Sequence, residues 1–134
     1  MQNDSIMKKL ILLLFSILIS FNSCAEWIEI SYNDKGDYFY VDVNSIKEHN
    51  GYVYWWELGD LKNPLINKYQ STKVYNQGDC SISRYKVLDF NVYEQHMGKG
   101  MIADSFTPEN PQWEYNMPGS SGIQIMDYVC DYIN

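Results

Sequence analysis

The chain of 134 residues is poor in the residues that build metal and nucleic-acid sites. It has three cysteines, two histidines, and only 10 basic residues against 17 acidic ones. An acidic protein repels phosphate backbones, so we expect no nucleic-acid partner. A structural zinc site needs about four Cys or His ligands at short spacing. His49 and His96 lie far from each other and from the cysteines in sequence, so we predict no metal and no other cofactor.

Catalytic motifs are also lacking. The sequence has no G-x-S-x-G nucleophile elbow and no glycine-rich phosphate loop. Ser83–Lys86 matches the S-x-x-K spacing, but it lies in an expected strand, and the companion S-D-N and K-T-G motifs are absent. Asp34, Asp37, Glu48 and Asp60 fall at expected turns and strand ends, where solvated charge is the default. We therefore predict no catalytic residues and a protein that is not an enzyme.

Only one long apolar run is present, and it lies near the N-terminus. Lys8 and Lys9 precede the run Leu10–Phe21, and the small residue Ser23 follows it. This order is the layout of a secretory signal. The run is shorter than the roughly 20 apolar residues that a membrane span needs. The sequence therefore predicts an exported protein.

The residues around Cys24 leave two alternatives for the mature end. Cleavage after Ala25 makes Ser23 and Ala25 the small residues of the cleavage site. This choice gives a signal peptide over residues 1–25 and one mature domain over residues 26–134. The other alternative is a lipid on Cys24, the only means by which the domain would touch a membrane. The first expected strand begins three residues later, a reach of at most about 11 Å, so we favour cleavage.

Alternating apolar residues and turn signals predict a β-sheet. Polar turn clusters such as Asn33–Asp37 and Asn50–Gly51 separate the apolar segments. The polar segment Asp60–Tyr69 contains a proline and is predicted to be a loop. Six strands are expected, over residues 27–31, 38–43, 52–58, 71–75, 81–93 and 101–106.

The third expected strand, YVYWWEL, is apolar on both faces until Glu57. Such a strand is usually central, with something covering each side. We expect one face to meet the core and the other to meet a helix or a partner chain, including a second copy of this chain. The candidate partner-binding aromatics are Tyr52, Tyr54, Trp55 and Trp56.

The end of the chain predicts a helix. Ser120 or Ser121 can cap it, and apolar residues follow at spacings of three and four, which gives one apolar stripe. Strands first and a single helix last indicate an α+β fold. We predict a roughly six-stranded antiparallel sheet with a C-terminal α-helix packed on one face. The residues of the stripe are Ile123, Met126, Val129, Cys130 and Ile133.

The cysteines suggest how this helix is held. If Cys24 leaves with the signal or carries a lipid, Cys80 and Cys130 remain as one pair. Their bond would tie the helix to the sheet and close a loop of about 50 residues, adding roughly 4 kcal/mol of stability. The alternative is two free buried thiols, which an oxidising compartment disfavours.

Several short segments follow one another in a familiar order. They are AEW, YVDVNSIK, NGYVYWWELGDLK, STKVYNQGDC, SRYKVLDFNVY, HMGKG and WEYNMPGS, ending at Cys130. This ordered set, over nearly all of residues 25–130, resembles the surface-adhesin protein E family of bacterial envelope proteins. The resemblance implies a six-stranded antiparallel sheet with a helix tethered by the Cys80–Cys130 disulfide. It also implies an envelope location, with the periplasm, the outer membrane surface and the medium as alternative destinations, and, in the founding lineage, adhesion to host extracellular proteins.

Two functions remain open at this point. The first is a non-enzymatic, adhesin-like envelope protein that binds a protein partner through a sheet face or loops. Its partners would include host extracellular proteins. The second is a periplasmic structural or small-ligand-binding protein with no host ligand. Labelling of intact cells separates the two functions, because a strictly periplasmic protein cannot be an adhesin.

Overall fold

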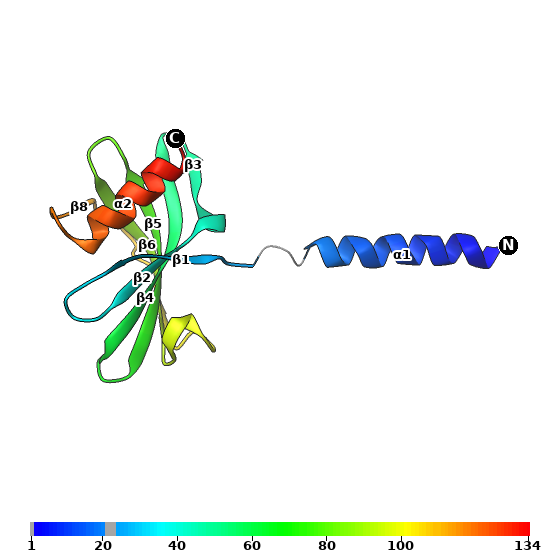
Figure 1. Ribbon diagram of the computed structural model, residues 1–134, viewed down its shortest axis with the longest axis horizontal. Helices are drawn as coiled ribbons and strands as arrows, with labels where there is room; N and C mark the ends of the chain where they lie inside the picture. The colour runs from blue at the N-terminus through cyan, green and yellow to red at the C-terminus, as the bar shows by residue number, and fades with distance from the viewer. Residues whose placement is uncertain (1, 21–23) are drawn as a thin grey trace.

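The structure is a computed structural model that describes residues 2–20 and 24–134. Helix α1 (Gln2–Ser20) stands apart from the other elements in Figure 1. None of the helices in these ranges is long and apolar enough to cross a membrane. Ser23, part of both proposed processing sites, lies outside the described residues.

The strands form one antiparallel sheet, as predicted. Its main path runs in the order β1-β2-β4-β5-β6-β7, and two short strands pair at the side, β3 with β4 and β8 with β6. Each sequential pair on the path is antiparallel, so hairpins and short connections suffice to build it. The strands are β1 (Trp27–Tyr32), β2 (Tyr38–Asp42), β3 (Lys47–His49), β4 (Tyr52–Leu65), β5 (Tyr69–Asp79), β6 (Arg84–Tyr93), β7 (Asp104–Phe106) and β8 (Glu114–Tyr115).

The hairpin of β4 and β5 corrects the prediction of a loop over Asp60–Tyr69. β4 continues to Leu65, which pairs with the first residue of β5. The polar residues Lys62 and Asn63 lie in an irregular stretch of β4, between the pairs Asp60–Ser71 and Leu65–Tyr69, and only residues 66–68 form a turn. Asp37, from the neighbouring turn, accepts a hydrogen bond from the backbone N–H of Lys62 at 3.1 Å. Backbone pairing and this carboxylate keep the strand extended where side-chain polarity indicated a loop.

β6 is shorter than predicted and begins at Arg84 instead of Ser81. The carboxylate of Asp79 accepts from both the backbone N–H (3.1 Å) and the hydroxyl (2.6 Å) of Ser81. This short-range hydrogen bonding favours a turn over a ladder. Ser83 then takes a left-handed conformation, with φ of 49°. β4, with 14 residues, is the longest strand in the described part of the chain.

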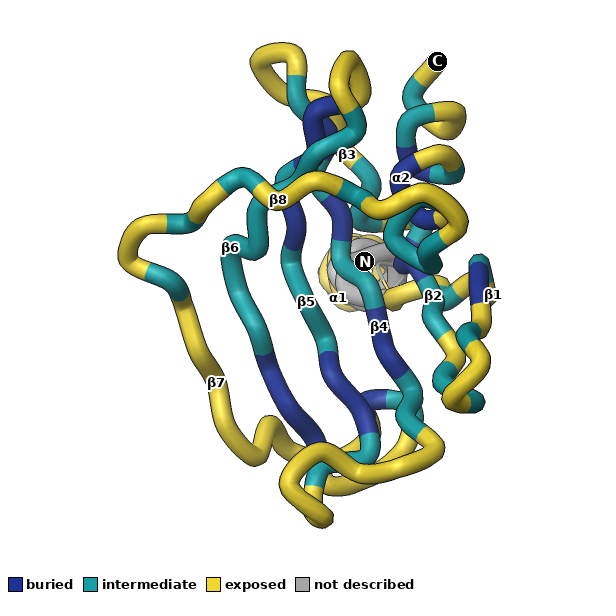
Figure 2. Tube along the Cα trace, turned by 90° about the vertical axis from the view of Figure 1, so that its left-hand side faces the viewer, coloured by how far each residue is buried: buried dark blue, intermediate teal, exposed yellow. Residues whose placement is uncertain are grey.

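The predicted C-terminal helix is α2 (Ser121–Tyr132). The hydroxyl of Ser120 accepts from the N–H of Ile123 at 3.3 Å and caps the helix. α2 lies on one face of the sheet, over its β1 and β4 side (Figures 1 and 2). The buried core is made of Val41, Val53 and Trp55 from the sheet and Ile125, Met126 and Val129 from the helix.

The Cys80–Cys130 disulfide is confirmed. It joins the turn after β5 to the last turns of α2, with a sequence separation of 50 residues and a Cα–Cα distance of 5.9 Å. The predicted α+β architecture is confirmed with it, because the helix is held to the sheet both by its apolar stripe and by a covalent bond.

Candidate functional site

The face of the sheet opposite α2 carries aromatic rings from β4. Side chains alternate between the two faces of a strand. Val53 and Trp55 therefore enter the core beneath α2, whereas Tyr52, Tyr54 and Trp56 project from the other face. These three side chains are partly exposed.

Neighbouring elements extend this set into a continuous band. Tyr75 of β5 lies opposite Trp56 in the ladder, and its ring centroid is 5.0 Å from that of Trp56 and 6.2 Å from that of Tyr54. Trp113, which precedes β8, lies 5.5 Å from Tyr52. These separations suit favourable ring pairing. We call the band of Tyr52, Tyr54, Trp56, Tyr75 and Trp113 the aromatic face.

Cations lie against one end of the aromatic face. The guanidinium carbon of Arg84 is 4.2 Å, and the ammonium nitrogen of Lys86 is 4.5 Å, from the ring centroid of Trp113. Arg84 also pairs with the carboxylate of Asp79 at 3.1 Å. Cations at these distances interact favourably with the ring face, so this end offers aromatic surface and positive charge together.

A hollow of about 290 Å³ continues the aromatic face toward β1. Trp56 forms part of its wall, and Lys73 places its ammonium group 4.9 Å from the ring centroid of Tyr93 and 5.7 Å from that of Trp27. Ala25 lines the hollow as well. The N-terminal end of the domain therefore lies on the same side of the sheet as the aromatic face.

Trp55 must be withdrawn from the candidate partner-binding residues. Its side chain is 2 % exposed and belongs to the core beneath α2, so a partner cannot reach it. Composition alone did not distinguish Trp55 from Trp56, but strand alternation does, once Val53 is assigned to the core. Sequence reasoning also missed Tyr75 and Trp113, which join the band only through the sheet register and the path of the chain before β8.

Glu57 is another residue that the sequence did not single out as a candidate. It lies on the helix side of β4, in a crevice of about 160 Å³ whose lining includes Phe39 and Tyr85. Burial raises the pKa of Glu57 to about 7, and a hydrogen bond of 3.1 Å from the side-chain amide of Asn76 partly opposes the increase. Burial likewise raises the pKa of Tyr85 to about 12. A lone carboxylate at the end of a strand apolar on both faces was the available signal.

The histidines do not come together with the cysteines. His96 places Nδ1 2.9 Å from the carboxylate of Asp60, which also accepts from the backbone N–H of Met97 at 2.9 Å. These contacts fasten the short helical turn η2 (His96–Gly98) to β4. Within residues 2–20 and 24–134, no three His, Cys, Asp or Glu side chains gather in a way that could hold a metal ion.

Cys24, the candidate lipidation site, is exposed. Its backbone carbonyl accepts a hydrogen bond of 2.9 Å from the side chain of Asn44. This contact fixes the start of the domain against the turn that follows β2. Any group attached to Cys24 would therefore begin one residue from Ala25 and the hollow beside the aromatic face.

Together these features define a class of domain: an antiparallel sheet that carries a disulfide-tied helix on one face and aromatic rings on the other. The sequence model of the surface-adhesin protein E family matches residues 27–131, which is more than half of the chain. The chain belongs to the surface-adhesin protein E family. No match is found among curated protein sequences.

Solved structures share the fold. Crystal form II of Haemophilus influenzae protein E superposes with a TM-score of 0.62 at 16% identity, covering 84% of this chain and 94% of that chain. The selenomethionine form gives a TM-score of 0.60 at 16% identity, with 82% and 89% covered. Protein E from non-typeable Haemophilus influenzae gives 0.54 at 16% identity, with 83% and 79% covered. At this identity the likeness establishes the fold.

Proposed function

We propose that this chain is an exported, non-enzymatic, adhesin-like envelope protein that binds a protein partner through the aromatic face. The observation that carries the proposal is the band of five partly exposed rings on the side of the sheet that α2 leaves open. Tyrosine, tryptophan and arginine dominate the energetic centres of protein interfaces. Arg84, stacked on Trp113, adds the third of these residue types.

The family and the disulfide support the same proposal. The family name describes surface adhesins, which makes host extracellular proteins the first class of partner to test. A disulfide between Cys80 and Cys130 is stable in an oxidising compartment and uncommon in a reducing one. Export through a signal peptide over residues 1–25, with a mature domain over residues 26–134, accounts for that compartment.

The proposed function can be tested with the purified mature protein. Binding to immobilised extracellular-matrix proteins is measured for the wild type and for Tyr54→Ser and Trp56→Ser. Each variant should weaken binding by about tenfold or more, since the central rings of an interface carry most of its energy. Tyr132→Ser is the matched control, because Tyr132 is 55% exposed on α2, away from the aromatic face. Equal binding by all four proteins would remove the aromatic face from the proposal.

A second candidate function is a periplasmic protein that binds a small ligand. The hollow with Lys73 between two rings favours this function, because an anionic group of a small ligand would meet a cation there. Location decides between the two functions. Surface labelling of intact cells, with the mass of the mature protein, gives exposure, the N-terminal residue and any lipid on Cys24. Labelling only after the outer membrane is opened would favour the periplasmic function.

A further inference from the structure

β7 is an open edge of the sheet. It ends the strand order, and all three of its residues are exposed, as the outer position of β7 in Figure 2 shows. It is shorter than the strand predicted over residues 101–106. In the described part of the chain no strand pairs with its outer side. An edge of this kind leaves backbone groups available to another strand.

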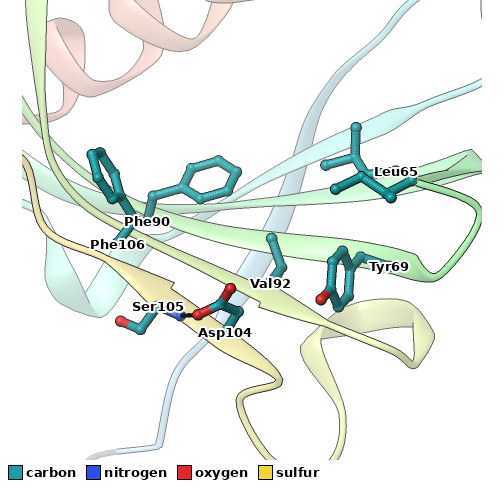
Figure 3. Close-up of a pocket in the computed structure, with 8 residues that line it drawn as sticks. Leu65, Tyr69, Phe90, Val92, Asp104, Ser105 and Phe106 are labelled. Carbon is teal, nitrogen blue, oxygen red and sulfur yellow. Dashed lines mark hydrogen bonds between the residues drawn. The ribbon is translucent and has the colours of Figure 1, made fainter.

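An apolar pocket of about 280 Å³ lies beside this edge. Phe90 and Val92 of β6 lie at its base, and Phe106 of β7 flanks it (Figure 3). Leu65 and Tyr69, at the tip of the β4–β5 hairpin, form the opposite wall. Aromatic and aliphatic side chains from four strands thus surround a space beside the sheet edge.

The sheet register places this pocket on the helix side. Phe90 is paired with Val74, Val74 with Glu57, and Glu57 with Val41, and directly paired residues point to the same face. Val41 packs beneath α2. The helix, however, covers the β1 and β4 side of this face, and the pocket lies toward the β7 end. The pocket therefore belongs to the uncovered half of the helix face, opposite in orientation to the aromatic face.

Large apolar side chains at the rim are exposed to solvent. Ile66 is 86% exposed, Phe106 64% and Leu65 42%. A contiguous exposed apolar patch beside an edge strand normally marks an interaction site. Apolar residues that are exposed singly need no such explanation, but these three residues surround one pocket.

We propose that the β7 edge and its pocket bind an extended peptide segment of another protein. The segment would add a strand antiparallel to β7 and insert a large apolar side chain into the pocket. An edge strand offers backbone groups to another backbone, and the pocket gives side-chain selectivity, which is how strand addition recognises peptides. The ladder continues an antiparallel sheet, so an antiparallel partner keeps its hydrogen-bond pattern.

The side chain of Asp104 affects both the solubility of the free β7 edge and the charge of the peptide segment that would bind there. Its carboxylate accepts from the backbone N–H of Ser105 at 2.8 Å (Figure 3). An incoming strand would offer a carbonyl oxygen to Ser105 instead. Asp104 also lines the pocket, so its negative charge disfavours acidic residues in the segment and favours lysine or arginine beside the apolar positions. This inference concerns a different surface from the aromatic face and does not depend on it.

The test uses ¹⁵N-labelled mature protein recovered from cells that export the full chain. The probe is the peptide KTVTFTVTK, whose apolar residues alternate with threonine. Its titration should shift the amide resonances of Asp104, Ser105, Phe106, Phe90 and Val92. The matched peptide N-methylated at its threonines should bind about tenfold more weakly or not at all, because these amides face the edge in antiparallel register. The peptide N-methylated at Val and Phe should bind as the unmodified one does.

Variants locate the binding surface. Phe106→Ala should weaken peptide binding by about tenfold, whereas Tyr115→Ala, an equally exposed aromatic at 65% on β8, should leave it unchanged. Equal affinity for both N-methylated peptides, equal effects of the two variants, or no shifts at millimolar peptide would overturn the proposal. Dimerisation of the protein that Phe106→Ala abolishes would also overturn it, because the occupant of the edge would then be a second copy of the chain.

Discussion

At the scale of single residues, Glu57 has the chemistry that depends most on its surroundings. It follows the core residue Trp55 on the same face of β4 and receives a hydrogen bond from Asn76, which is 1% exposed. Burial raises the pKa of Glu57 to about 7 from an ordinary value of 4.5. The folded state therefore holds a proton at a pH where the unfolded chain has lost it.

Glu57→Gln should change the pH dependence of stability. The pKa of Glu57 is higher in the folded than in the unfolded state, so protonation of this carboxyl stabilises the folded wild type. This stabilisation is fully present below pH 4.5 and is lost as the pH rises through about 7. The variant keeps a neutral side chain at every pH. In urea unfolding it should match the wild type near pH 4.5 and exceed it by up to about 3 kcal/mol at pH 8.

Glu48→Gln provides the control for this measurement, because Glu48 is exposed on β3. It should follow the wild-type pH profile. If Glu57→Gln and Glu48→Gln give the same pH dependence, the carboxyl of Glu57 is already ionised in the fold near neutral pH and the burial argument is wrong.

Gly78 is a residue where the lack of a side chain permits helix packing. A Cβ there would lie 2.7 Å from Cζ3 of Trp55 and 3.1 Å from Sδ of Met126. Gly78→Ala should therefore lower the free energy of unfolding by about 1–3 kcal/mol through overpacking. Gln77→Ala, on the neighbouring residue that faces the other side, should change it by less than about 0.5 kcal/mol. Similar urea midpoints for the two variants would contradict the packing described here.

At the scale of elements, the disulfide and the apolar stripe hold α2 jointly. The stripe contributes Met126 and Val129 to the core, Ile125 of α2 joins them there, and the covalent bond closes a loop with a sequence separation of 50 residues. The helix also meets β1 through polar contacts, where the Ser31 hydroxyl lies within hydrogen-bond reach of Ser121 and Gln124. The helix cap at Ser120 fixes its start.

Replacing both Cys80 and Cys130 with serine should lower the free energy of unfolding by about 4 kcal/mol, because the unfolded chain regains the freedom of a 50-residue loop. The measurement is urea unfolding of the oxidised wild type beside the double variant. Reduced wild-type protein is the control and should unfold as the variant does. A loss below about 1 kcal/mol would mean that the stripe alone anchors α2.

Much of this architecture could be predicted from local patterns. Short sequence patterns indicate the hairpin turns, the alternation of β6 and the capped amphipathic helix. The cysteine count indicates the pairing of Cys80 with Cys130. The extension of β4 to Leu65 could not be predicted, because it depends on pairing with β5 and on the carboxylate of Asp37 from another turn. The start of β6 at Arg84 instead of Ser81 depends likewise on one carboxylate, that of Asp79.

The candidate site was predictable only in part, for the same reason. The aromatic content of YVYWW indicated a surface beside a core, and Tyr52, Tyr54 and Trp56 do lie opposite α2. Tyr75 belongs to the aromatic face because of the register between β4 and β5, and Trp113 because the chain before β8 returns to β6. Neither arrangement can be predicted from the local sequence.

At the scale of the whole molecule, the sheet divides two kinds of surface. One face carries α2, the crevice of Glu57 and, toward β7, an apolar pocket at an open edge. The other carries the aromatic face, with Arg84, Lys86 and Lys73 against aromatic rings. The whole chain has a net charge of −7, so the positive charge of these three side chains contrasts with the negative charge of the chain. A partner with acidic groups beside an apolar centre would match this face in charge.

Photo-cross-linking on intact cells tests most directly whether the aromatic face contacts a partner. Cells that export the full-length chain, with benzoylphenylalanine in place of Tyr54 or of Tyr132, are applied to immobilised extracellular-matrix proteins and irradiated. Contact through the aromatic face predicts a covalent adduct with a matrix protein from position 54 and none from position 132, at equal surface display. Adducts of equal yield from both positions, or from position 132 alone, would contradict the claim that this face binds the partner.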